Sequence, residues 1–197
     1  MGFTSKQLAD MQQRLTNGAV TTSASIKFKG SQIILGVDPS LRGTGYGVIN
    51  TSKSIPTTLA QGTIKCPSSW PMSRCFLEIS NTLESVIKET APTVAAIEGL
   101  FFAQNIKTAL VMGQARGAAL TAITKAGLDA FEIAPRKVKQ AIVGFGGAQK
   151  EAVAKMVQTR LALSATPSPD AADALAIALA FSQSAGASIP DQAIKPL

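Results

Sequence analysis

Two short apolar runs, each followed by an acidic residue, constrain the fold of this chain most strongly. The first run occupies residues 33–37 and ends at Asp38, and the second occupies residues 94–97 and ends at Glu98. Runs of this length and composition are typical of buried strands. Segments with helical spacing separate and follow them. The pattern therefore predicts an α/β domain that carries carboxylates at the ends of its strands.

The predicted elements alternate along the chain. Strands are expected at 32–38, 46–50, 57–65, 93–98 and 130–134, and helices at 72–89, 106–125, 135–143, 148–163 and 170–184. The third strand alternates only weakly, which favours a position at the sheet edge. Three consecutive strands followed by strand–helix alternation predict a five-stranded mixed sheet with helices on both faces.

The same pattern divides the chain into three parts. Residues 32–185 form the predicted domain, and a chain of this length can bury its own core. Residues 1–31 are expected to be an N-terminal extension and linker, flexible or with a short helix between Leu8 and Leu15. Residues 186–197 are expected to be a flexible tail.

Composition excludes several classes of protein. Hydrophobic residues make up 46% of the chain and charged residues 16%, which argues against disorder. No apolar run reaches the roughly 18–20 residues of a membrane span, and no secretory leader is recognisable. The two cysteines have neither a disulfide framework nor metal-binding spacing. The expectation is a cytoplasmic protein that has no membrane partner.

A basic stretch indicates a polyanionic partner. The net charge is +7, and the stretch contains only one acid, Glu151, against the basic residues Arg136, Lys137, Lys139, Lys150, Lys155 and Arg160. Such a stretch is typical of a contact with a nucleic-acid backbone, and Arg136, Lys139 and Lys150 are its candidate DNA-binding residues. A solvated helix face has the same composition. The acids elsewhere in the chain favour the first interpretation, because a polyanion approaching them needs positive charge nearby.

Two further acids, Asp170 and Asp173, open an Ala-rich segment and lie three residues apart, on one face of a helix. Together with Asp38 and Glu98 they would form a set of hard oxygen ligands that suits Mg²⁺, or Mn²⁺ in its place, rather than zinc. Two such ions about 4 Å apart activate water and stabilise the leaving oxygen in phosphodiester hydrolysis. The four acids are therefore predicted to be catalytic and to bind two metal ions.

Each acid also has a purely structural explanation. Asp38 could close a turn before Pro39, Glu98 could simply end a strand, and Asp170 and Asp173 could favour a helix N-terminus. The joint interpretation is preferred because acids stand at three separate element ends in a chain that has only 12.

Other motifs leave alternatives open. The Gly-rich segment 43–47 could approach a phosphate, although a hairpin between the first two strands is favoured. Phe101 could belong to the core or stack on unpaired bases. Lys139 and Lys150 flank a Gly-rich break and could contact the scissile phosphate or be ordinary surface lysines. Residues 114–117 favour packing or a subunit contact.

Taken together, these motifs resemble the RuvC family of bacterial Holliday-junction resolvases, which have an RNase H-like fold. The resemblance runs from about residue 33 to 181. It rests, in chain order, on Gly36-Val37-Asp38-Pro39-Ser40, Thr44-Gly45-Tyr46-Gly47, Ile97-Glu98, Gly113-Gln114-Ala115-Arg116-Gly117, Val138-Lys139-Gln140, Val143-Gly144 and Asp170-Ala171-Ala172-Asp173-Ala174-Leu175-Ala176.

The resemblance implies a homodimer that binds a four-way DNA junction and nicks two strands of like polarity by two-metal hydrolysis, with a branch-migration motor complex as a further partner. By position, the four acids match the catalytic residues of the family. Phe101 matches the aromatic that stacks at the opened junction, and Lys139 and Lys150 match basic residues near the cut phosphate. Gly99 departs from the Gln that is common after the catalytic Glu.

Three alternative functions remain at this stage. One is a non-catalytic junction-binding protein, and another is a broader nuclease of the same fold that acts on branched DNA or RNA–DNA hybrids. The sugar-kinase and actin-like ATPase group also ends its first strand in Asp, but those proteins usually need two such domains. Metal-dependent cleavage of a synthetic junction separates the nuclease from the binder.

Overall fold

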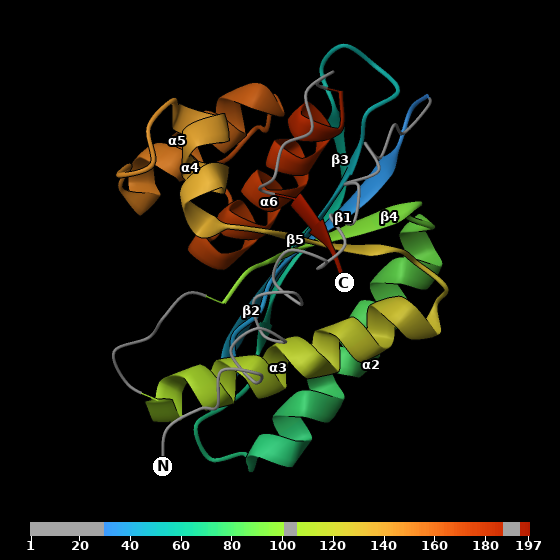
Figure 1. The fold of residues 1–197 in the computed structure, drawn as a ribbon, viewed down its shortest axis with the longest axis vertical. Coiled ribbons are helices and arrows are strands. Elements are labelled where there is room, and N and C mark those ends of the chain that lie inside the picture. The colour runs from blue at the N-terminus through green and yellow to red at the C-terminus, as the bar shows by residue number, and fades with distance from the viewer. Residues whose placement is uncertain (1–29, 101–105, 187–193) are drawn as a thin grey trace, which may run out of the picture.

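A central sheet with helices on both faces makes up the domain (Figure 1). The computed structural model describes residues 30–100, 106–186 and 194–197. The short N-terminal helix expected near Leu8 and the predicted base-stacking residue Phe101 lie outside this part of the chain.

The sheet is mixed, as predicted, and its strand order is β3-β2-β1-β4-β5-β6. The strands are β1 (Ile33–Asp38), β2 (Gly43–Asn50), β3 (Thr57–Lys65), β4 (Val94–Glu98), β5 (Ala130–Ile133) and β6 (Ile194–Pro196). β1 pairs antiparallel with β2 and parallel with β4, and β4 pairs parallel with β5. The antiparallel β1–β2 pair confirms the predicted hairpin, and β3 lies at the sheet edge, as its weak alternation indicated.

The sheet has six strands instead of the predicted five. The additional strand, β6, lies within the segment 186–197 that the sequence assigned to a flexible tail, and it pairs antiparallel with β5, where Lys195 lies opposite Glu132. Leu197 extends the pairing by donating its backbone N–H to the Ala130 carbonyl at 3.0 Å. This strand is not recognisable from the sequence, because three residues that include a proline are too few to show alternation.

Helices cover both faces of the sheet. They are α2 (Met72–Thr90), α3 (Ile106–Lys125), α4 (Pro135–Val143), α5 (Lys150–Arg160) and α6 (Pro169–Gly186). In Figure 1, α2 and α3 lie on one side of the sheet and α4, α5 and α6 on the other. Strand β1 explains this arrangement, since Ile34 packs in the core under α4–α6 while Leu35 and Val37 pack in the core under α2 and α3. No described helix is long and apolar enough to cross a bilayer.

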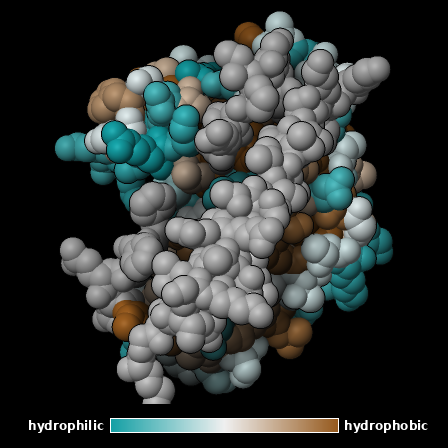
Figure 2. Space-filling model, viewed as in Figure 1, coloured by the Kyte–Doolittle hydropathy of each residue, from teal (hydrophilic) through white to brown (hydrophobic). Residues whose placement is uncertain are grey.

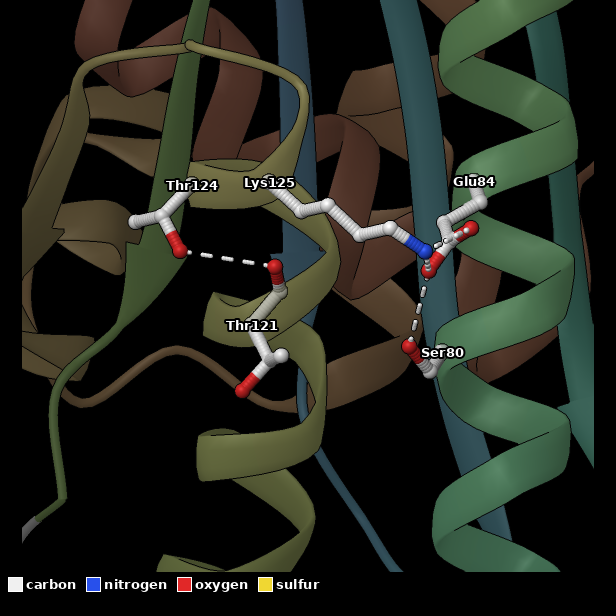
Figure 3. A network of polar contacts seen from close by, with 5 residues as sticks. All are labelled: Ser80, Glu84, Thr121, Thr124 and Lys125. Atoms are coloured by element: carbon white, nitrogen blue, oxygen red, sulfur yellow. Dashed lines mark hydrogen bonds and ion pairs between the residues drawn. The ribbon is translucent and has the colours of Figure 1, made fainter.

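Helices α2 and α3 are joined at their surface by a small polar network (Figure 3). Lys125, in the last turn of α3, forms an ion pair of 3.0 Å with Glu84 on α2. Ser80 donates a 3.3 Å hydrogen bond to the same carboxylate. An exposed pair of this kind contributes about 0–1 kcal/mol, so the two helices are held mainly by the apolar core between them and the sheet.

Helix α6 lies unusually close to the sheet because glycines face it. A Cβ on Gly36 of β1 would overlap the carbonyl oxygen of Ala174, and a Cβ on Gly45 of β2 would overlap the carbonyl oxygen of Asp170. Glycine removes these clashes and lets the helix backbone rest on the strands. The first two turns of α6 are thereby placed beside the ends of β1 and β2, where Asp38 lies.

Candidate active site

Asp38 and Glu98 lie side by side at one end of the sheet. Strands β1 and β4 run parallel, and Val37 is in register with Ile97. The residue that follows in each strand is an acid, so both acids lie at the same end of the sheet. Their side chains are hydrogen-bonded to each other. The predicted convergence of these two acids is observed.

Burial makes this pair of acids unusual. Removal from water raises the pKa of Asp38 to about 6, and the nearby negative charge of Asp173 acts in the same direction. Burial also raises the pKa of Glu98 to about 8, with the charge of Asp38 and the hydrogen bond between them as further causes. Without a cation the pair therefore holds a proton at neutral pH, and Glu98 carries it.

Asp170 and Asp173 approach the pair from α6. Asp170 lies in the first helical turn, where its carboxylate faces Gly43, and a Cβ on that glycine would stand 3.0 Å from Oδ2. Asp173 follows one turn later and accepts a 2.9 Å hydrogen bond from the ammonium of Lys150, the first residue of α5. The charges of both aspartates raise the pKa of Asp38, which places all three acids within electrostatic reach of one another.

The chemistry of these donors fits hard divalent cations. Four carboxylates gather without a histidine or thiolate, and burial together with their mutual repulsion raises the pKa of Asp38 and Glu98. Within the described part of the chain, no three acidic, histidine or cysteine side chains are already packed closely enough to hold an ion. The ammonium of Lys150 brings a positive charge beside the acids.

The other predicted basic residues lie on α4. Arg136 is exposed and its aliphatic stem packs against Gly146 in the turn before α5, while Lys139 is half-buried. Lys150 contacts the acid cluster directly through Asp173. Helix α4, which carries Arg136 and Lys139, packs against α6, the helix that carries Asp170 and Asp173 (Figure 1). The surface over α4 and α5 is largely hydrophilic (Figure 2).

Two residues that support Glu98 were not predicted. Arg116 on α3 donates a 3.4 Å hydrogen bond to the Glu98 carbonyl and forms a 2.5 Å ion pair with Glu132 on β5. Arg116 belongs to the segment 114–117, for which packing or a subunit contact was favoured. An ion pair at Glu132 could have been predicted from the sequence, because an acid within a short buried strand needs a positively charged partner.

Gly99 leaves room for this ion pair. A Cβ at this position would lie 3.1 Å from the Cγ and Cδ atoms of Glu132, closer than most side-chain contacts. A larger residue here would push against the carboxylate that Arg116 holds. The glycine after Glu98 and the acid at position 132 therefore fit each other sterically.

A mixed sheet of this order, with acids at the ends of its two central strands and on the helix packed across them, defines a class of protein, the RNase H-like nucleases. Comparison with known families identifies the branch of this class. The family model described as crossover junction endodeoxyribonuclease RuvC matches residues 34–181. The chain belongs to this family.

Similar proteins are found among bacteria. The crossover junction endodeoxyribonuclease RuvC of Chloroflexus aggregans is 41% identical over 152 residues, which cover 77% of this chain and 93% of the relative. That of Bordetella avium is 44% identical over 146 residues, covering 74% and 81%. Among solved structures, Thermus thermophilus RuvC in complex with a Holliday junction substrate superposes with a TM-score of 0.74 at 33% identity, covering 84% of this chain and 99% of that one.

Proposed function

We propose that this protein is a structure-selective endodeoxyribonuclease that resolves four-way DNA junctions by metal-dependent phosphodiester hydrolysis. The observation that carries the proposal is the meeting of Asp38 and Glu98 on adjacent parallel strands, with Asp170 and Asp173 facing them from α6. Membership of the RuvC family and the likeness to a relative bound to a Holliday junction substrate support the choice of DNA junctions as substrate.

The four acids would hold two Mg²⁺ ions, with Mn²⁺ as a substitute. When bound, such ions activate the attacking water and stabilise the leaving oxygen. The protein contributes rigidly mounted oxygen ligands, because Asp38 and Glu98 end strands and the aspartates stand on a helix packed against them. Lys150 brings a positive charge to the same place and is suited to contact the phosphate that is cut.

The proposed DNA-binding residues Arg136 and Lys139 would continue the contact away from the scissile phosphate. Both stand on α4, next to the helix that carries Lys150. Positive charges along this path would neutralise the DNA backbone on one side of the acids.

A homodimer is part of the proposal. Ile106 and Leu110 on α3 are 78% and 64% exposed, and Gly113 and Gly117 continue the same helix face. Among the described residues, no atom lies within 4 Å of a Cβ built on Gly117, which leaves room there for a second helix. Figure 2 shows a hydrophobic patch near the start of α3. A second copy packed there would give the two active sites that symmetric cutting of two strands requires.

The decisive experiment incubates the protein with a synthetic four-way junction in Mg²⁺, in Mn²⁺ and in EDTA. Paired nicks on two strands of like polarity are expected in either metal, and none in EDTA. Linear duplex DNA and an RNA–DNA hybrid serve as control substrates. Binding without nicking would instead support a non-catalytic junction binder, and equal cleavage of all three substrates would support a broader nuclease.

A further inference from the structure

A second positively charged surface lies at the same end of the sheet as the acids, on the α2 side. It consists of Arg42, Trp70 and Arg74, and we call it the α2-side surface. Arg42 directly precedes β2, and the Cys66 N–H bonds to its carbonyl at 3.2 Å, which places the β3–α2 loop beside it. Gly43, the next residue, faces Asp170 on α6. Neighbouring side chains alternate across a strand, so Arg42 lies on the opposite side of the sheet.

Arg42 fixes the loop that carries Trp70. One of its terminal nitrogens donates hydrogen bonds to the Pro67 carbonyl at 2.5 Å and to the Trp70 carbonyl at 3.1 Å. The same nitrogen lies 3.2 Å from the Cys75 sulfur on α2. Two of these contacts tie the loop to the sheet end, and the third ties the same guanidinium to α2. The loop is therefore a rigid platform.

The guanidinium of Arg74 lies over the Trp70 ring of this platform. Its guanidinium carbon is 3.9 Å from the centre of the Trp70 ring, and the side chain is exposed. Stacking on an aromatic face leaves the N–H groups at the guanidinium edge free to point outward, in the geometry that matches a phosphate. In the described chain no ion pair joins Arg74 to an acid, and Glu78 one turn further on accepts a hydrogen bond from Thr82.

Helix stability does not explain an arginine at this position. Arg74 stands in the first turn of α2, where the helix dipole disfavours positive charge, and this turn contains no acid. The tryptophan orients this exposed cation, and among the described residues no ion pair with an acid neutralises it. A negatively charged ligand is the partner that this arrangement fits.

We propose that the α2-side surface binds the phosphate backbone of a duplex DNA arm, on the side of the acids opposite to α4 and α5. This inference rests on the proposed function and adds a second contact to it. DNA that passes over the acid cluster continues in two directions. Arg136, Lys139 and Lys150 would neutralise one direction, and Arg74 and Arg42 the other. Trp70 acts as a positioning residue for Arg74.

The test measures junction affinity as a function of salt for Arg74→Ala, with Lys88→Ala as the matched control. Lys88 is an exposed basic residue of the same helix, 14 residues or about 21 Å beyond Arg74. Both variants are made in a cleavage-deficient Asp38→Asn protein. Arg74→Ala is expected to weaken binding about 3- to 10-fold and to reduce the salt slope by about 0.9, the value for one phosphate contact. Lys88→Ala is expected to change neither quantity.

Trp70→Ala provides a second, independent variant. It keeps the arginine but removes the ring beneath it, so it should weaken binding by part of the Arg74→Ala effect, and Trp70→Phe should restore most of it. Thermal unfolding of each variant checks the fold. If Arg74→Ala matches Lys88→Ala in affinity and salt slope, the α2-side surface does not bind DNA. If the unsubstituted protein fails to bind junctions at all, the proposed function itself is wrong.

Discussion

The ammonium of Lys150 lies 2.9 Å from Oδ2 of Asp173, and this pair ties the first residue of α5 to the acid cluster on α6. The lysine thus stands among the acids that are proposed to hold metal ions. One lysine cannot neutralise four carboxylates, and burial together with the remaining negative charge raises the pKa of Asp38 and of Glu98.

Asp38→Asn should abolish cleavage while it spares or tightens junction binding. Asparagine keeps the shape of the side chain but removes a metal ligand and one negative charge near the DNA. We expect the rate to fall by at least about 1,000-fold, which corresponds to roughly 4 kcal/mol of transition-state stabilisation. Single-turnover cleavage and gel-shift titration measure the two effects. Parallel loss of binding and cleavage would indicate misfolding instead.

The metal-free protein should become less stable as the pH rises from about 4.5 to 8. In this window the folded state keeps a proton on Glu98, with a pKa of about 8, while the unfolded chain, with an ordinary value of 4.5, has released it. The folded state then binds more protons than the unfolded state, so the free energy of unfolding decreases with increasing pH. Asp38 acts in the same direction up to about pH 6.

Thermal unfolding in EDTA at pH 5, 6.5 and 8 measures this trend. Glu98→Gln should flatten it, because glutamine does not titrate. Mg²⁺ should raise the melting temperature most at pH 8, where protons compete least with the ion for the carboxylates. An identical pH trend in Glu98→Gln and in the unsubstituted protein would contradict the assignment of the proton to Glu98.

Arg116→Ala should lower both the stability of the protein and its apparent affinity for Mg²⁺. It removes the donor to the Glu98 carbonyl and leaves Glu132 without its partner, so the free energy of unfolding should fall by about 1–3 kcal/mol. The Mg²⁺ concentration for half-maximal cleavage should rise about 10- to 100-fold, as is usual when a group that orients a metal ligand is removed. The same substitution in a Glu132→Gln protein should cost less stability. Equal costs in both backgrounds would mean that the ion pair adds no stability.

Leu110→Glu should convert the proposed dimer into a monomer. The side chain lies 64% exposed on the apolar face of α3, where a charge would be buried between two copies. Sedimentation or light scattering at several concentrations gives the mass, and paired nicking of junctions should be lost with the dimer. Leu77→Glu, at a 60% exposed leucine of α2, is the control. A dimer that survives Leu110→Glu would place the interface elsewhere.

The sequence predicted those features that repeat over several residues. Each helix and strand of the domain core was expected within a few residues of its observed bounds, because apolar spacing reports burial directly. The meeting of Asp38 with Glu98 followed from the parallel pairing of two strands that both end in an acid. The placement of Asp170 and Asp173 could be anticipated only through the joint chemistry of the four acids.

Contacts between elements that are separate in the sequence, and elements of very few residues, were not predictable. The ion pair between Arg116 and Glu132 joins a helix to a strand 16 residues away, and nothing local marks the two as partners. Strand β6 is too short to show a period. The Gly-rich segment 43–47 signalled a hairpin correctly, but the contact of Gly36 and Gly45 with α6 depends on the packed backbone of another element.

That contact has a consequence for how the enzyme would meet its substrate. With no side chain between helix and sheet at Gly36 and Gly45, main-chain atoms themselves set the spacing between the acids of α6 and the acid of β1. At these two positions no side chains lie between α6 and the sheet that could repack to change the distance between them. The backbone positions of the α6 aspartates are thus set relative to Asp38 by main-chain packing, and only side-chain rotation is left to bring the carboxylates closer.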